Sequence, residues 1–148
     1  MRHIAWITPL MLSATFALAG PDAPIPPDVN MVAADASIPA PLAQYSGRWS
    51  GMWIGAGDRL NHVLIIEKIS PEAFTAVYAW GDSMGEYGNT KAGWRRINGT
   101  VDNGKLAAKL GQANVSYEMN SNGTISGVFT NAKGFASKAT LKKDAGGV

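Results

Sequence analysis

The chain has 148 residues, with 13 Lys and Arg against 11 Asp and Glu, two His and no Cys. A net charge of +2 is too small for a protein that binds nucleic acid mainly through phosphate contacts. The lack of Cys excludes disulfides, thiol catalysis, iron–sulfur clusters and zinc fingers. One domain is the default at this length, and 17 Gly with five Trp indicate tight turns and aromatic packing, as in small β-barrels.

The start of the chain has the three parts of a secretory signal peptide. Arg2 gives a basic start, residues 4–18 are mostly apolar, and Ala17 and Ala19 fit the small-x-small pattern of a cleavage site. The apolar stretch is shorter than the roughly 20 residues of a membrane-spanning helix, and Pro9 interrupts it. We therefore expect a signal peptide over 1–19 that is cleaved after Ala19, a periplasmic or secreted location, and no membrane span afterwards.

Residues 20–43 contain six of the eight prolines and show no hydrophobic period. Because Pro fixes φ and removes a hydrogen-bond donor, we expect this segment to be a flexible, semi-extended linker. The pattern changes after it, so the sequence predicts a β-barrel domain over 44–142 and a disordered tail over 143–148.

From Tyr45 the hydrophobic period is two, and Gly, Pro or Asn recur at the spacing of about 8–12 residues that is typical of a β-sandwich or barrel. Asn-Gly pairs at 103–104 and 122–123 predict hairpins, and the connections are short enough for antiparallel neighbours. The predicted strands span residues 45–54, 60–69, 73–80, 92–101, 104–110, 113–119, 124–130 and 135–142.

The last four predicted strands alternate between an apolar and a polar face, as in a soluble sheet with one core. In an outer-membrane barrel, the outward face would place Lys138, Lys142 and Glu118 in lipid. We therefore predict an all-β fold that is an eight-stranded antiparallel up-and-down barrel, because closure removes free edges. A β-sandwich is the alternative fold.

Gly47 and Trp49 form a Gly-x-Trp motif on the first predicted strand. This motif on a small meander barrel resembles the calycin superfamily, which includes lipocalins, fatty-acid-binding proteins and avidins; the resemblance covers residues 45–142. It implies a lipocalin-like barrel in which Gly47 and Trp49 form a structural plug at one end, with Lys138 or Lys142 stacked on Trp49. It implies no ligand, because the later lipocalin motifs and the carboxyl-terminal helix are absent.

The loops after the first, third, fifth and seventh strands of a meander share one rim. This rim holds the two longest loops, 55–59 and 81–91, so we expect the barrel to open there. Aromatic rings that stack on planar ligands and sparse polar groups gather at this rim, as in small-molecule sites. The predicted ligand-binding residues are Trp53, Trp80, Trp94, Phe129, Phe135, His62, Tyr87 and Arg95.

Within this site, Arg95 is the residue that would pair with a carboxylate or phosphate. The alternative is that the aromatic rings simply fill the barrel and leave no pocket. Trp94 and Ile97 also have opposite parity on one strand. Either a bulge near Arg95 or an outward Trp94 is needed to reconcile them.

Two motifs resemble catalytic sequences without the structural context that those need. Residues 99–105 match the start of a P-loop, but Leu106 replaces the Ser or Thr, and the match lies on a predicted hairpin. Residues 81–84 resemble the nucleophile block of the Gly-Asp-Ser-Leu hydrolases, but no His follows His62.

A lone His is typical of a satisfied structural residue. The alternatives for His62 are a metal site shared with Asp58 and Asp82, haem ligation, or an acid/base pair with Asp58. No nucleophile signature accompanies these residues. We therefore predict a protein that is not an enzyme, with no catalytic residue, no metal site and no cofactor.

The sequence thus predicts a secreted or periplasmic barrel that binds a small, partly apolar or aromatic molecule at an aromatic-lined mouth. It has no nucleic-acid partner. The alternative is a protein-interaction barrel, such as a bacterial enzyme inhibitor or envelope accessory protein, that uses its amino-terminal segment or its surface. The Pro-rich segment 20–43 motivates this alternative.

Overall fold

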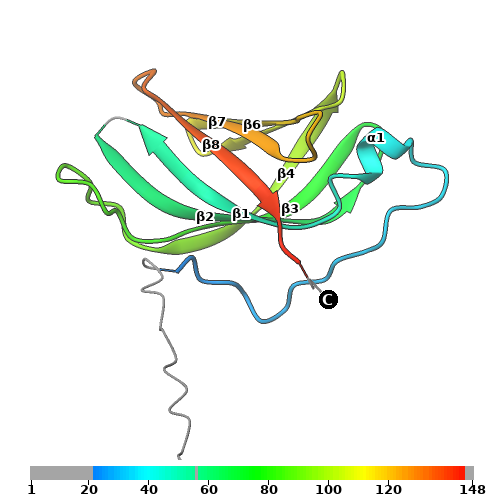
Figure 1. The fold of residues 1–148 in the computed structure, drawn as a ribbon, viewed down its shortest axis with the longest axis horizontal. Helices are drawn as coiled ribbons and strands as arrows, with labels where there is room; N and C mark the ends of the chain where they lie inside the picture. Colours follow the sequence, from blue (N-terminus) through cyan, green and yellow to red (C-terminus); the bar gives the residue numbers. More distant parts are fainter. Residues whose placement is uncertain (1–21, 56, 146–148) are drawn as a thin grey trace, which may run out of the picture.

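A computed structural model describes residues 22–55 and 57–145, in which eight antiparallel strands form a closed up-and-down barrel (Figure 1). Every strand pairs with its neighbours in sequence, and β8 closes the barrel on β1. The predicted barrel is confirmed, and the sandwich alternative is wrong. The elements are α1 (Ala40–Ala43), β1 (Gly47–Gly55), β2 (Asp58–Ile69), β3 (Ala73–Trp80), β4 (Gly93–Asp102), β5 (Lys105–Leu110), β6 (Ala113–Met119), β7 (Ile125–Thr130) and β8 (Ala136–Lys143).

Turn chemistry accounts for the tight hairpins. Asn103 and Gly104 have φ values of 49° and 75°, so both residues of the β4–β5 turn occupy the left-handed region. That conformation suits the right-handed twist of the flanking strands, and Asn-Gly adopts it at little cost. The segment that resembles a P-loop is therefore a β-hairpin.

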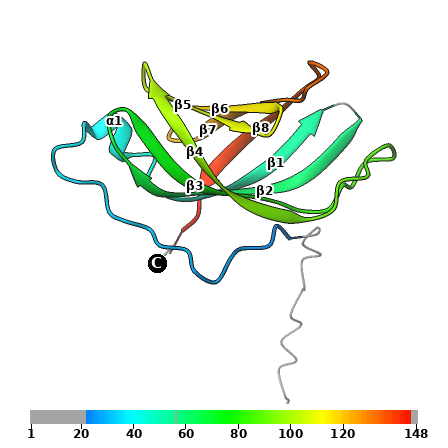
Figure 2. The ribbon, with the colours of Figure 1, turned by 180° about the vertical axis from the view of Figure 1, so that it is seen from behind.

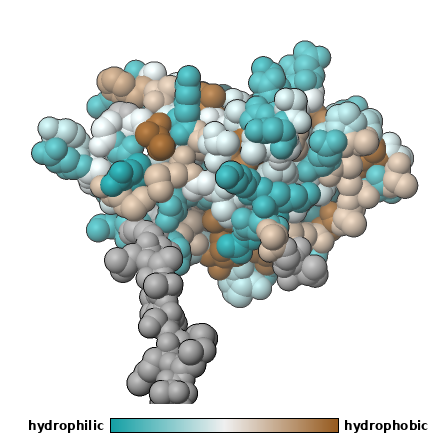
Figure 3. All heavy atoms as spheres, viewed as in Figure 1, coloured by the Kyte–Doolittle hydropathy of each residue, from teal (hydrophilic) through white to brown (hydrophobic). Residues whose placement is uncertain are grey.

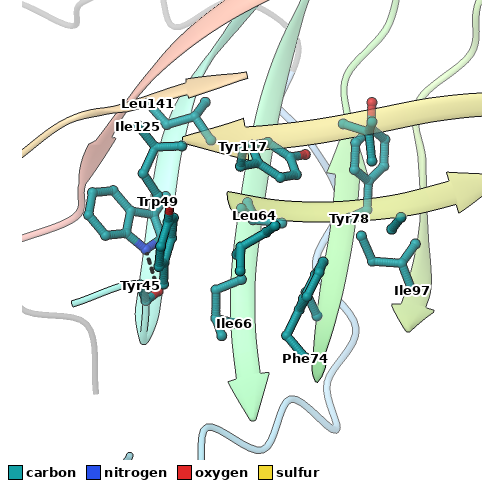
Figure 4. Close-up of a cluster of buried hydrophobic side chains, with 14 of the residues drawn as sticks. Tyr45, Trp49, Leu64, Ile66, Phe74, Tyr78, Ile97, Tyr117, Ile125 and Leu141 are labelled. Carbon is teal, nitrogen blue, oxygen red and sulfur yellow. Dashed lines mark hydrogen bonds between the residues drawn. The ribbon is translucent and has the colours of Figure 1, made fainter. Parts of the chain in front are cut away.

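One end of the barrel is closed by side chains from the start of β1. Tyr45 crosses this end: its hydroxyl donates to the Gly104 carbonyl at 2.7 Å and accepts from the Met119 N–H at 2.8 Å. The indole N–H of Trp49 donates to the Tyr45 carbonyl at 2.8 Å (Figure 4). These bonds tie the residues that enter β1 to the β4–β5 turn and to the end of β6, and they plug the barrel.

The Gly-x-Trp motif has a geometric reason here. Gly47 has a φ of 114°, and a Cβ at this position would lie 3.0 Å from Cε of Lys143. The ammonium of Lys143 lies over the Trp49 ring, 5.3 Å from its centroid. A basic residue of the last strand therefore contacts Trp49 as the resemblance implied. It is Lys143, and not Lys138 or Lys142, because only Lys143 has the parity of the inward residues Ala139 and Leu141.

The Pro-rich segment lies along the outside of β2 and β3 before it reaches α1 (Figures 1 and 2). Ala23, Ile25 and Val29 of this segment cover a second apolar cluster on the outer face of the barrel. The outward side chains of that cluster are Val63, Ile65, Val77 and Ala79. The expectation of a flexible linker is therefore corrected over residues 22–32, which we call the strap: apolar burial and polar bonds hold it on the barrel.

Polar bonds to Glu67 fix the strap in register. The Asn30 N–H donates to Glu67 Oε1 at 3.0 Å, and the Val32 N–H donates to the Glu67 carbonyl at 2.7 Å. Glu67 lies where the β2–β3 register shifts, at an irregularity between Ile66 and Lys68. A bulge of this kind turns one extra residue outward, so Ile66 and Ile69 both stay buried while Glu67 faces the strap.

The barrel also extends into the predicted tail. Lys143 belongs to β8, and Asp144 accepts hydrogen bonds from Arg48 Nε at 2.7 Å and from Ser50 Oγ at 2.8 Å. The predicted disordered segment 143–148 is thus wrong for its first two residues, because these bonds attach them to β1. The predicted signal peptide, 1–19, and residues 146–148 lie outside the described residues.

On the face shown in Figure 3, hydrophilic residues are interspersed with isolated hydrophobic ones. No helix in the described part of the chain is long and apolar enough to cross a membrane.

Candidate ligand-binding site

The closed half of the barrel interior is filled. Inward side chains of β1, β2, β3, β7 and β8 pack there on Trp49 and Tyr45 (Figure 4). Leu64, Ile125 and Leu141 in this layer have no solvent exposure. The plug and this layer leave the other end of the barrel as the end with space.

A cavity of about 340 Å³ opens at that other end, beside the β1–β2 turn and the β3–β4 loop. Its volume lies within the range of roughly 300–1,000 Å³ that small-molecule sites occupy. The lining combines aromatic walls, two leucines and a few polar groups. The residues are Trp53, Gly55, Asp58, Leu60, Tyr78, Trp80, Thr90, Arg95, Leu110, Phe129, Asn131 and Ser137.

The aromatic walls belong to one connected cluster. The Trp53 ring lies with its centroid 6.5 Å from that of Tyr78 and 6.1 Å from that of Phe129. Tyr78 in turn contacts Trp80 at 5.8 Å. The indole N–H of Trp80 donates to the Lys91 carbonyl at 2.8 Å, which fixes this ring to the β3–β4 loop. The cavity is therefore walled by rings held in place by each other.

His62 lies below the cavity and is completely buried. Its Nδ1 is 2.8 Å from the Ala79 carbonyl, which can only accept, so Nδ1 carries the proton. Its Nε2 therefore accepts from the Tyr117 hydroxyl at 2.8 Å. Burial lowers the pKa of His62 to about 4, so the ring is neutral near pH 7. Both ring nitrogens are occupied, which makes His62 a structural residue.

Asp58 organises the loop over the mouth. Its Oδ1 accepts from the Arg59 and Gly85 N–H groups at 2.8 and 3.1 Å, and its Oδ2 accepts from Ser83 Oγ at 2.7 Å. Partial burial alone would raise the pKa of Asp58, but these hydrogen bonds together bring the pKa below its usual value. The carboxylate is therefore ionised and committed to the loop.

The hydrogen bonds between the β3–β4 loop and Asp58 require two glycines in the loop. A Cβ on Gly85 would lie 2.3 Å from the Gly57 carbonyl oxygen, and a Cβ on Gly88 would lie 2.3 Å from Asp58 Oδ1. The loop backbone therefore reaches Asp58 only because both positions lack a side chain. The β3–β4 loop is thus held against the β1–β2 turn.

The structure brings together four of the eight predicted ligand-binding residues: Trp53, Trp80, Phe129 and Arg95 all line the cavity. His62 lies beneath it, in contact with Trp53 at a centroid distance of 5.0 Å. The other three predicted residues lie elsewhere.

Trp94 does not line the cavity. The β3–β4 register runs without a shift from Gly93 to Thr100, so no bulge exists and the parity of the buried Ile97 turns Trp94 outward. Trp94 lies 42% exposed, with the Arg96 guanidinium 5.8 Å from its ring centroid. The same parity turns Arg95 inward.

Tyr87 and Phe135 are also outside the cavity. Tyr87 is 80% exposed at the tip of the β3–β4 loop, beside Gly57. Phe135 is 59% exposed in the turn before β8, where its N–H donates to Asn131 Oδ1. Both rings lie in turns, to which strand alternation does not apply.

Sequence reasoning missed several lining residues, Tyr78 above all. Tyr78 has the parity of Trp80 on β3, and Leu60 has the parity of His62 on β2. Alternation alone therefore could have placed both on the inner face. Leu110 has the parity of Leu106 on β5, and Ser137 has the parity of Leu141 on β8, so alternation places these two inward as well. Asn131 lies in the β7–β8 turn and carries no such signal.

Among the described residues, no three His, Asp or Glu side chains stand close enough together to hold a metal ion. A scan against protein-family models finds no match for the chain, and a search of curated proteins finds none either. The fold and the cavity are therefore the basis for a functional proposal: a closed eight-stranded barrel, consistent with a calycin-like one, that contains a buried aromatic cluster.

Proposed function

We propose that this protein is a lipocalin-like barrel that binds a small, partly apolar or aromatic molecule in the cavity at its open end. The observation that carries the proposal is the cavity of about 340 Å³ enclosed by Trp53, Tyr78, Trp80 and Phe129. Aromatic walls with few polar groups are the usual composition of small-molecule sites, and rings of this kind stack on planar ligands.

We propose the periplasm or the cell exterior as the place of this activity, on the basis of the signal peptide that the sequence predicts over 1–19. The calycin resemblance supports the proposal through the plugged end, where Gly47, Trp49 and Lys143 form the expected contact. Binding without catalysis fits a site in which His62 is buried and both of its ring nitrogens are hydrogen-bonded.

The alternative of an inhibitor that inserts its amino-terminal segment into a target needs that segment free. Ala23, Ile25 and Val29 are packed on the barrel instead, and the backbone of Asn30 is bonded to Glu67. Ligand binding at the mouth is therefore the function that the geometry supports best.

The test is to fill the cavity and measure binding. Leu110 lines the cavity, whereas its neighbour Lys109 is exposed on the outer face. Leu110→Trp therefore adds a large ring inside the mouth, and Lys109→Trp adds the same ring outside. We expect calorimetric binding of N-phenyl-1-naphthylamine and of naphthalene derivatives to the native chain and to Lys109→Trp, with loss in Leu110→Trp. Equal binding by both variants, or no binding of any compound by the native chain, contradicts the proposal.

A further inference from the structure

The polar groups of the cavity are unevenly satisfied, and this imbalance indicates the chemistry of the ligand. We infer that the proposed ligand carries a carboxylate, or another compact anionic group, on its flat apolar body, and that Arg95 binds this group. The inference rests on the proposed function and adds the ligand class to it.

The first observation is the position of Arg95. Arg95 is the register partner of Tyr78 in the β3–β4 pairing, so both side chains leave the sheet on the inner face, side by side. The guanidinium of Arg95 makes no ion pair or side-chain hydrogen bond to any residue of the described ranges. By contrast, its neighbour Arg96 points outward and bonds to Glu67 at 3.0 Å and to Asp28 at 3.1 Å. Arg95 is thus an exposed cation at the rim of an apolar mouth, within reach of a ligand in the cavity.

The second observation is that the carboxylate and amide oxygens of the cavity are already used. The oxygens of Asp58 accept from Arg59, Ser83 and Gly85. The side-chain oxygen of Asn131 accepts from the Lys133 and Phe135 N–H groups at 3.0 Å each. A ligand that brought hydrogen-bond donors to this mouth would find these oxygens occupied.

The third observation is that an amide donor remains at the mouth. Because the Asn131 oxygen is engaged in its turn, the amide NH₂ of Asn131 is the end left for the cavity. The Arg95 guanidinium and the Asn131 amide NH₂ at the same mouth favour a ligand with an anionic acceptor group.

The size of the cavity limits the apolar body of the ligand. The floor of the cavity is the ring layer of Trp53 above His62, and the walls are Tyr78, Trp80 and Phe129. A volume of about 340 Å³ accepts a two-ring aromatic body and excludes long extended chains. The class is thus a compact aromatic carboxylate, with its rings between the aromatic walls and its anionic end at Arg95.

Three matched naphthalene probes test the inference: 2-naphthoate, the neutral 2-naphthylmethanol and the cationic 2-naphthylmethylamine. Each is titrated by calorimetry into the native chain, Arg95→Gln and Arg59→Gln. Arg59 is the control because it lies on β2 near the mouth but points outward and is exposed. Thermal unfolding checks that each variant is folded.

We expect naphthoate to bind the native chain about 10- to 100-fold more tightly than the alcohol, as a charge-assisted hydrogen bond allows. Arg95→Gln should remove this preference and leave the affinity for the alcohol unchanged, while Arg59→Gln should change neither. Equal binding of acid and alcohol to the native chain, or a preference that survives Arg95→Gln, overturns the inference and leaves the proposed function standing. Binding of none of the three probes overturns both.

Discussion

The outer face of β2–β3 and the outer face of β5–β8 belong to the same barrel but are built differently. Val63, Ile65 and Val77 on β2–β3 are buried beneath the strap. The outward residues of β5 and β6, such as Lys105 and Glu118, are more than half exposed. The β2–β3 part of the barrel is therefore buried on both faces, and the β5–β8 part on one.

The hydrophobic pattern of the sequence differs between these two parts of the barrel, as the difference in their burial requires. Residues 62–66 and 76–80 are nearly continuous apolar runs, whereas residues 113–119 alternate. A strand that is covered on both faces has no polar face to alternate with. Continuous runs in a predicted meander therefore indicate that something outside the barrel covers those strands, and here the cover is the Pro-rich strap.

The largest expected effect on stability distinguishes two isoleucines, one under the strap and one on an exposed outer face. Ile65 is 2% exposed on the outer face of β2, and Ile54 is 62% exposed on the outer face of β1. Ile65→Ala should lower the free energy of unfolding by about 2–5 kcal/mol because it leaves a cavity under the strap. Ile54→Ala should change it by about 0.5 kcal/mol or less. Urea denaturation measures both; similar small losses would show that the strap does not form a second core.

The second effect is a pH dependence of the free energy of unfolding. It comes from His62 on β2, in the part of the barrel that is buried on both faces. The unfolded chain binds a proton at His62 below about pH 6.5, while burial lowers the pKa in the folded chain to about 4. The unfolded state thus gains protons first as the pH falls, and stability decreases between these values. The loss is about 3 kcal/mol in total and disappears above pH 7.

Denaturation at several pH values between 4 and 8 measures this loss. His62→Gln is the matched variant, because an amide can donate to the Ala79 carbonyl and accept from Tyr117. The difference between the native chain and His62→Gln removes the contribution of carboxylates. Parallel pH profiles for the two proteins would contradict a buried neutral His62.

The third effect compares two glutamates in ion pairs. Glu67 is 10% exposed and bonds to Arg96 and the strap, whereas Glu118 is 58% exposed and pairs with Lys105 at 3.3 Å. Glu67→Gln should cost about 1–2 kcal/mol, since Arg96 is itself partly solvated. Glu118→Gln should cost about 0.5 kcal/mol or less. Only Glu67→Gln should also make residues 22–32 more sensitive to limited proteolysis; equal sensitivity would mean that Glu67 does not hold the strap.

The comparison between these two parts of the barrel also shows how far the sequence predicts the structure. The strand order and turns are local: Asn-Gly at 103–104 sets its own turn, and period two sets each strand. The docking of the strap depends on contacts between residues far apart in the sequence, such as Asn30 with Glu67, which are 37 positions apart, and Pro content alone gives no indication of it. Composition predicts that a segment is extended, but not what it lies against.

The candidate site shows the same limit. Trp53, Trp80, Phe129 and Arg95 lie near strand ends, where rim position alone placed them at the mouth, and all four line the cavity. Trp94 needed the knowledge that β4 has no bulge, which is a property of pairing with β3. Tyr87 and Phe135 lie in turns, where ring direction depends on the turn conformation. Inward facing was therefore predictable where register is regular.

The smallest effect concerns the strand that closes the barrel. The resemblance implied that Lys138 or Lys142 stacks on Trp49, whereas the structure places Lys143 there, 5.3 Å from the ring. Lys143→Gln should cost about 0.5–1 kcal/mol, as expected for a partly solvated cation over an indole. Lys138→Gln and Lys142→Gln make the same charge change on the outward face of β8 and should cost less. If all three variants lose equal stability in urea, the contribution is that of net charge, and the contact with Trp49 adds nothing to the plug.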